Sequence, residues 1–120
     1  MAYYDIKGEK DLGKAFTTLL AVGCDDIRAQ QACMELSGLN VGYTFTNYPA
    51  HTSVILIGKT TSAEEAYDTI QHELKHVTEH ISNYYNVDPK SERAAYLQGE
   101  IGKRMFPAAA LVFCPKCNCK

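Results

Sequence analysis

The sequence of 120 residues lacks the long apolar runs and the charge imbalance that mark several large classes of protein. No apolar run approaches the roughly 20 residues that a membrane-spanning helix needs, so we expect no membrane partner. The formal net charge of −2 provides no basic field that would attract nucleic acid, and we expect no nucleic-acid partner either. The polar N-terminal residues carry no secretory apolar segment, which favours a cytoplasmic protein.

Internal repeats, low-complexity tracts and long linkers are also missing, which favours one domain with one modest core. The five cysteines are an odd number in a chain without a secretory segment, so we expect reduced thiols rather than a disulfide framework. Three of these cysteines lie in CPKCNCK at the end of the sequence. We therefore divide the chain into a single domain, residues 1–113, and a cysteine-rich tail, residues 114–120.

The first half of the chain predicts two helices followed by two strands. Apolar periodicity indicates a helix over residues 9–21 and a second helix that Asp25 or Asp26 caps and that runs to about Leu36. Residues 41–46 and 53–58 have the aromatic and β-branched content of strands, and the turn between them predicts an antiparallel hairpin.

The second half predicts two more helices. Thr61 or Ser62 can cap a long helix that runs to about Tyr84. Asp88 and Pro89 are typical of the start of a last helix, which should end near Pro107. The apolar residues 108–113 fit either a short strand or a packed tail. The predicted fold class is therefore α+β, with about four helices and a small antiparallel sheet of two or three strands.

The long helix carries the most informative motif, HELKH at residues 72–76, which matches HExxH. His72 and His76 are one helical turn apart on the same side, so both imidazoles can reach one metal ion. Glu73 is placed to act on a water that the metal activates. The apolar residues of the helix form a separate stripe that should face the core. The motif predicts a Zn²⁺ site with Glu73 as general base, and the simpler alternative is a pair of surface histidines.

A catalytic zinc needs a third protein ligand and an open position for water. We favour Glu92, because it shares one face of the last helix with Ala95 and Gly99, whose small size would let that face approach the HExxH helix. Glu100 is the alternative ligand, or else an ion-pair partner or a solvated residue. The opposite face of this helix should pack in the core and carries Ala94, Leu97, Ile101 and Met105.

Another group is needed to stabilise the oxyanion or to bind substrate, and the sequence offers several candidates. His80 lies one turn beyond the motif, where a straight helix would place it at the rim of the site. Tyr96 shares the face of Glu92. The candidates are His80, Tyr84, Tyr85, Tyr96 and His51, and for His51 and Tyr96 a solvated or packing role is the alternative.

HELKH followed by SERAAYLQGEI resembles the small gluzincin-like metallopeptidases of phages and mobile elements. It is also similar to the ImmA/IrrE group, in which a helix after HExxH supplies a glutamate ligand. The resemblance covers about residues 40–106 and implies a compact zincin core, with zinc held by His72, His76 and Glu92 and with Glu73 as base. It also implies that residues 41–57 supply the edge strand that aligns a peptide.

These observations favour a zinc-dependent metallopeptidase that acts on a peptide or protein substrate. One alternative is a catalytically idle zincin fold that binds a partner protein. Another is a small metal-binding regulator, in which Cys114, Cys117 and Cys119 form a second metal site. Cys24 or Cys33 could complete that site only if the fold brings them near, and otherwise we expect them in or beside the second helix.

Overall fold

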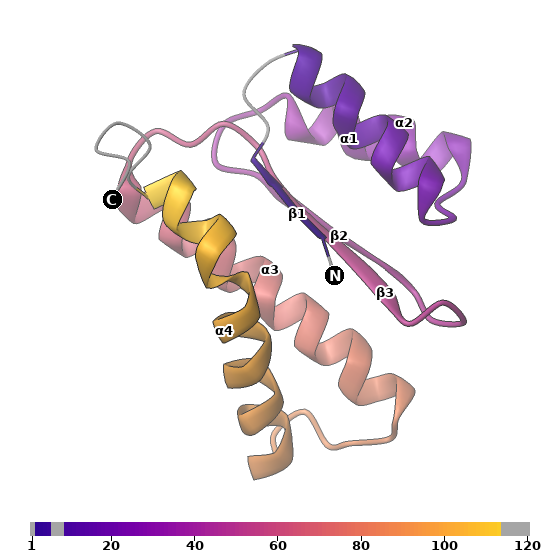
Figure 1. Ribbon diagram of the computed structural model, residues 1–120, viewed down its shortest axis with the longest axis vertical. Coiled ribbons are helices and arrows are strands. Elements are labelled where there is room, and N and C mark those ends of the chain that lie inside the picture. Colours follow the sequence, from indigo (N-terminus) through magenta and orange to yellow (C-terminus); the bar gives the residue numbers. More distant parts are fainter. Residues whose placement is uncertain (1, 6–8, 114–120) are drawn as a thin grey trace.

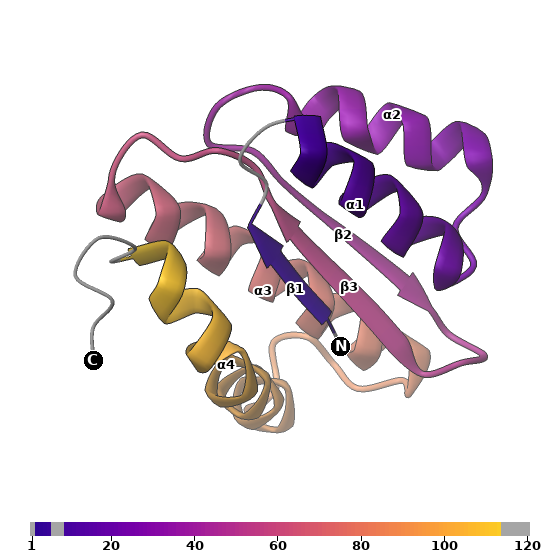
Figure 2. The same ribbon diagram turned by 45° about the horizontal axis from the view of Figure 1, so that its top comes forward.

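A computed structural model shows three layers, with a sheet between two pairs of helices (Figure 1). The structure describes residues 2–5 and 9–113. Helices α1 and α2 cover one face of the sheet, and α3 and α4 lie on the other (Figure 2). The elements are β1 (Ala2–Asp5), α1 (Glu9–Ala21), α2 (Asp26–Leu36), β2 (Gly42–Asn47), β3 (Thr52–Ile57), α3 (Ala63–Tyr84) and α4 (Glu92–Phe113). The predicted α+β class with four helices is confirmed for these residues.

The sheet has the strand order β1-β3-β2. Strands β2 and β3 form the predicted antiparallel hairpin, with Phe45 opposite Val54. Strand β1 was not predicted, and it pairs in parallel with β3, so that Ala2 also lies opposite Val54. Four residues carry little periodicity, and their partner is distant in the sequence, so only the folded chain reveals this strand.

Strand β3 supplies both cores, because successive side chains of a strand point to opposite faces. Val54 and Leu56 pack with the buried residues of α1 and α2. Ile55 and Ile57 pack with those of α3 and α4. All four side chains are fully buried, so β3 fixes both helical layers relative to the sheet.

Local capping explains where α2 and α3 begin. The Asp25 side chain accepts a hydrogen bond from the Arg28 amide at 2.8 Å, and the Ser62 side chain accepts one from the Glu65 amide at 3.1 Å. Each bond satisfies an amide that the first turn leaves without a helical partner. Both predicted starts are confirmed.

Helix α4 differs from its prediction at both ends. Asp88 accepts from the Lys90 amide in a turn, and the Ser91 hydroxyl accepts from the Ala94 amide at 3.2 Å, so the helix begins at Glu92 rather than at Pro89. It continues through Pro107 to Phe113, so residues 108–113 are helical. A proline removes one backbone hydrogen bond from a helix, but Pro107 does not end α4.

No helix in the described part of the chain is both long and apolar enough to cross a membrane.

Candidate metal centre

Helix α3 separates an apolar side from a histidine side. Its predicted apolar stripe is largely confirmed, since Ala66, Ile70, Leu74 and Val77 are buried and only Ala63, in the first turn, is exposed. The histidine side faces β2, as the contacts of Glu73 and His80 with this strand show. Amphipathic periodicity therefore directs the motif towards the free edge of the sheet.

His72 and His76 converge on one point. Their Nε2 atoms are 3.1 Å apart, and their ring centroids are separated by 4.6 Å with an angle of 84° between the planes. Two nitrogens that bind one zinc ion at about 2.05 Å each, with a tetrahedral angle, are about 3.3 Å apart. The pair therefore has the spacing of two ligands of a single ion.

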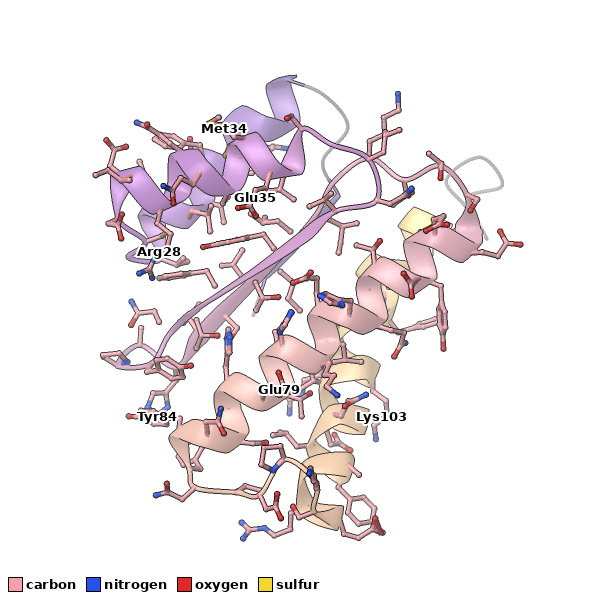
Figure 3. All side chains as sticks on the ribbon, turned by 180° about the vertical axis from the view of Figure 1, so that it is seen from behind. Arg28, Met34, Glu35, Glu79, Tyr84 and Lys103 are labelled. Atoms are coloured by element: carbon pink, nitrogen blue, oxygen red, sulfur yellow. The ribbon has the colours of Figure 1, made fainter. Side chains whose placement is uncertain are left out.

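The other nitrogen of His76 also has an acidic neighbour. Its Nδ1 atom lies 3.7 Å from a carboxylate oxygen of Glu79, one turn further along α3 (Figure 3). Carboxylates beside the second nitrogen of a metal-binding histidine orient the ring and increase its basicity. At 3.7 Å the two atoms are too far apart for a hydrogen bond, so Glu79 lies near this position without holding the ring.

Glu73 is buried against strand β2, with only 4% of the residue exposed. The Thr44 hydroxyl donates a hydrogen bond of 2.6 Å to its Oε1 atom. A Cβ atom at Gly42 would lie 2.5 Å from the Cγ atom of Glu73, so this carboxylate fits only beside a residue without a side chain. Strand β2 therefore positions Glu73, the predicted base, in two ways: through the hydrogen bond from Thr44 and through the close contact with Gly42.

His80 contacts the same strand two residues further along. Its Nδ1 atom is 2.8 Å from the Thr46 hydroxyl, which is 2.9 Å from the hydroxyl of Ser53. The pKa of His80 is lowered, mainly by burial and secondly by the neighbouring His76. The contact with Thr46 leaves Nε2 as the ring nitrogen of His80 that is available to the site.

A cavity of about 290 Å³ brings these groups together, lined by the three histidines, Glu73 and residues 42–44. It shares lining residues with a second cavity towards Asn40 and with a third towards Tyr48, so one groove follows β2. On the side of α2, Arg28 lines this groove (Figure 3). The expected edge strand of the site is therefore β2.

The backbone of β2 has hydrogen-bonding groups directed towards this groove. The Gly58 amide donates to the Val41 carbonyl, so the backbone groups of Val41 point towards β3. Hydrogen-bonded positions alternate along an antiparallel strand. The backbone groups of Gly42, Thr44 and Thr46 therefore point away from β3, at the free edge of the sheet.

The structure does not bring Glu92 to the histidine pair. The described residues contain no group of three His, Cys, Asp or Glu side chains arranged to hold a metal ion. Glu92 and Ala95 are exposed, and no atom of the described residues lies within 4 Å of a Cβ atom placed on Gly99. The expected approach of this face to α3 is wrong.

The opposite face of α4 makes the contact with α3 instead. Ala94, Ile101 and Met105 are buried, as predicted, and Leu97 packs against the same cluster. Burial of this apolar stripe lowers the free energy of the fold, whereas burial of a charged residue at the helix contact would raise it. The helix is therefore oriented with Glu92 towards solvent. Glu100 is also exposed and forms an ion pair with Lys103 at 2.7 Å, one of the roles considered for it.

The candidates for oxyanion or substrate binding lie in different places. Tyr96 is 73% exposed, on the outward side of α4 with Glu92. His51 and Tyr84 line a pocket at the end of α3, and His80 lines the cavity of the motif. Of the candidates, His80 is therefore the one beside the histidine pair and Glu73.

The C-terminal cysteines Cys114, Cys117 and Cys119 lie outside the described residues. Cys24 is buried and Cys33 is half-buried, as expected for residues in or beside the second helix. Burial raises the pKa of both thiols.

Sequence reasoning missed Gly42, Thr44 and Thr46. The alternation of the predicted strand places the two threonines on one face, with Tyr43 and Phe45 on the other, where they pack against the core of α1 and α2. Pairing these threonines with a particular turn of α3 requires the folded structure.

No protein-family model, curated protein or solved structure matches this chain.

Proposed function

We propose that this protein is a zinc-dependent peptidase, with His72 and His76 as zinc ligands and Glu73 as general base. The observation that supports this proposal best is the 3.1 Å separation of the two Nε2 atoms beside a buried glutamate at the edge of a sheet. The resemblance to gluzincin-like enzymes and the ImmA/IrrE group remains part of this proposal.

The donor set fits zinc in part. The two imidazoles have suitable spacing and chemistry, and the carboxylate of Glu79 lies beside the second nitrogen of His76. A third protein ligand is not assembled among the described residues, and Glu92 is turned to solvent. Zinc, when bound, would polarise the scissile carbonyl and lower the pKa of water towards about 7.

The residues around Glu73 suit it to proton transfer. The hydrogen bond from Thr44 holds Oε1, and we assign Oε2 to the exchange of protons. In this role Glu73 takes a proton from the attacking water and passes it to the leaving amine. His80, held by Thr46 through Nδ1, can direct its Nε2 atom towards the developing oxyanion.

The edge of β2 suits an extended peptide. The outward backbone groups of Gly42, Thr44 and Thr46 offer main-chain hydrogen bonds, and the groove along β2 offers space for side chains. A peptide added to this edge would pass directly beside Glu73. The substrate class that this geometry favours is a peptide or an unfolded segment of a protein.

The test combines metal content with cleavage. The wild-type protein, a variant lacking residues 114–120 and His72→Ala are compared for zinc stoichiometry, with the metal located by anomalous scattering. We expect zinc to remain after the deletion and to be lost in His72→Ala. Zinc that disappears only with the tail would instead support the regulator that binds metal through its cysteines.

Cleavage is then tested with a diverse peptide library, analysed by mass spectrometry. We expect Glu73→Gln to bind zinc and to cleave about 10²- to 10⁴-fold more slowly, because a general base contributes about this factor. Cleavage that is unchanged in Glu73→Gln would rule out the proposed mechanism.

A catalytically idle, partner-binding protein is the second candidate, and the missing third ligand among the described residues favours it. This candidate predicts zinc binding or a folded apo-protein without cleavage of any peptide in the library. A stable complex with an intact polypeptide would then replace hydrolysis as the measured activity.

A further inference from the structure

An aromatic pocket lies where the turn between β2 and β3 meets the end of α3. Tyr48 stacks on Tyr84 with ring centroids 5.2 Å apart and an angle of 14°, and the ring of His51 meets Tyr84 and Tyr85 edge to face. Tyr84 lies at the end of α3, beside this turn (Figure 3). The pocket is completed by Ile81, Thr46 and Ser53.

The backbone of the turn directs His51 towards these tyrosines. His51 has a φ of 53°, in the left-handed region, and its amide donates to the Tyr48 carbonyl at 3.1 Å. A second bond of the turn runs from the Ala50 amide to the side chain of Asn47. The pocket is therefore part of the hydrogen-bonded turn and is not a gap between loose side chains.

The size and lining of the pocket favour an apolar side chain. Its volume is about 180 Å³, and an apolar cavity of about 150 Å³ is sufficient to bind benzene. None of the described residues that line it is acidic, and the stacked faces of Tyr48 and Tyr84 leave no space between them for a cation. Tyr84 and Tyr85 are 47% and 57% exposed, and exposed aromatic side chains around a cavity are typical of binding sites.

The pocket continues the groove along β2. Thr46 and Tyr48 line both the pocket and the neighbouring cavity that contains His80. From Glu73 to Ile81 the helix rises about 12 Å. An extended peptide covers that distance in three or four residues, at about 3.3 Å per residue.

We infer that this pocket binds a large apolar or aromatic side chain of the substrate, three or four residues from the scissile bond. The part of this inference that concerns the scissile bond rests on the proposed peptidase function. The pocket itself can be tested without catalysis. In a peptide that runs antiparallel to β2, the bound side chain lies on the N-terminal side of the scissile bond.

The binding test uses N-acetyl-L-phenylalanine amide and N-acetyl-L-alanine amide as probes, with amide NMR spectra of the full chain. We expect only the phenylalanine probe to give saturable shifts, at Thr46, Ile81, Tyr84 and Tyr85. Tyr84→Ala should bind this probe about two- to tenfold more weakly, as expected for the loss of one aromatic contact. Tyr96→Ala removes an exposed tyrosine of α4 and should change nothing. Shifts elsewhere, or none that saturate, would overturn the inference.

The peptide library links the pocket to cleavage. We expect cleaved peptides to be enriched in Phe, Tyr, Leu or Met at the third or fourth position on one side of the scissile bond, and Tyr84→Ala to reduce this enrichment. Cleavage without such enrichment overturns the specificity role while the peptidase proposal stands. Absence of all cleavage contradicts the peptidase proposal, and the probe titration still decides whether the pocket binds an apolar side chain.

Discussion

Helices α3 and α4 are equal in length, with 22 residues each, and both pair a buried apolar stripe with a polar face. Their polar faces nevertheless meet different surroundings. That of α3 lies across from β2, where Thr44 and Thr46 bond to Glu73 and His80. That of α4, with Glu92, Tyr96 and Glu100, points to solvent.

The difference shows that a polar helical face becomes a candidate site only where another element stands opposite. Both faces carry residue types that can bind metal or move protons. In α3 the facing strand buries the carboxylate and fixes its direction. In α4 the same chemistry is solvated, and charges there are worth little because water screens them.

The largest change that we expect is in zinc affinity, compared between substitutions on the polar faces of α3 and α4. His72→Ala should weaken zinc binding by more than about 100-fold, since even groups that only orient a ligand cost 10- to 100-fold. Glu92→Ala is the matched substitution on α4 and should leave the affinity unchanged. Both are measured by competition with a zinc chelator. A comparable loss in Glu92→Ala would mean that α4 turns towards the histidines when zinc binds, and the contrast between the helices would fail.

The next effect concerns the contact between α3 and β2. Thr44→Val removes the hydroxyl that donates to Glu73 and leaves a buried carboxylate oxygen without this partner. We expect a loss of about 1.5–3 kcal/mol in the free energy of unfolding, as for other hydrogen bonds to charged groups. Urea denaturation measures it, and Thr44→Ser, which keeps the hydroxyl, is the control. Equal stability of the valine and serine variants would show that this bond contributes nothing.

Two glycines allow the packed surroundings of the α3 face to be compared with the open surroundings of the α4 face. Gly42→Ala places a methyl group 2.5 Å from Glu73 Cγ, so it should destabilise the fold by about 1–3 kcal/mol and slow any hydrolysis that depends on Glu73. The methyl group of Gly99→Ala on α4 has no neighbour within 4 Å in the described part of the chain. It should stabilise the protein by about 0.5–1 kcal/mol, because alanine favours a helix over glycine. Thermal unfolding should therefore shift in opposite directions, and shifts of the same sign would contradict the placement of one of these glycines.

The smallest expected effect is on the surface of α4. The hydrogen bond and charge of Lys103 lower the pKa of Glu100 below its ordinary value. A carboxyl group with a lowered pKa in the folded state adds stability above its ordinary pKa, and this contribution is lost as the pH falls through the lowered value. Lys103→Met should therefore reduce the melting temperature slightly near pH 7, and this reduction should disappear as the pH falls through the lowered pKa of Glu100. A reduction that grew as the pH fell would have the wrong sign.

The sequence predicted those features that depend on neighbouring residues. The cap at Ser62 and the spacing of His72 and His76 lie within a few residues along α3, and both are present in the structure. The hairpin of β2 and β3 is local in the same sense. Each of these features could be derived from composition and period alone.

The features that were missed depend on distant contacts or on competing local signals. Strand β1 exists through its pairing with β3, and Thr44 becomes part of the site only because β2 crosses α3. At the start of α4, Asp88 and Ser91 both offer capping oxygens, and only the fold selects Ser91. Which face of α4 meets α3 is decided by burial of the apolar stripe, and this places Glu92 outside.

The absence of a side chain at Gly42 has a consequence for engineering. Where β2 passes Glu73, the main chain of Gly42 packs directly against the glutamate side chain, with no replaceable side chain between them. Every substitution at Gly42 adds atoms, so none can enlarge the groove there. Redesign of the proposed substrate specificity would have to begin at the far end of the groove, where Tyr48, Tyr84 and Tyr85 can be exchanged for smaller or differently shaped residues.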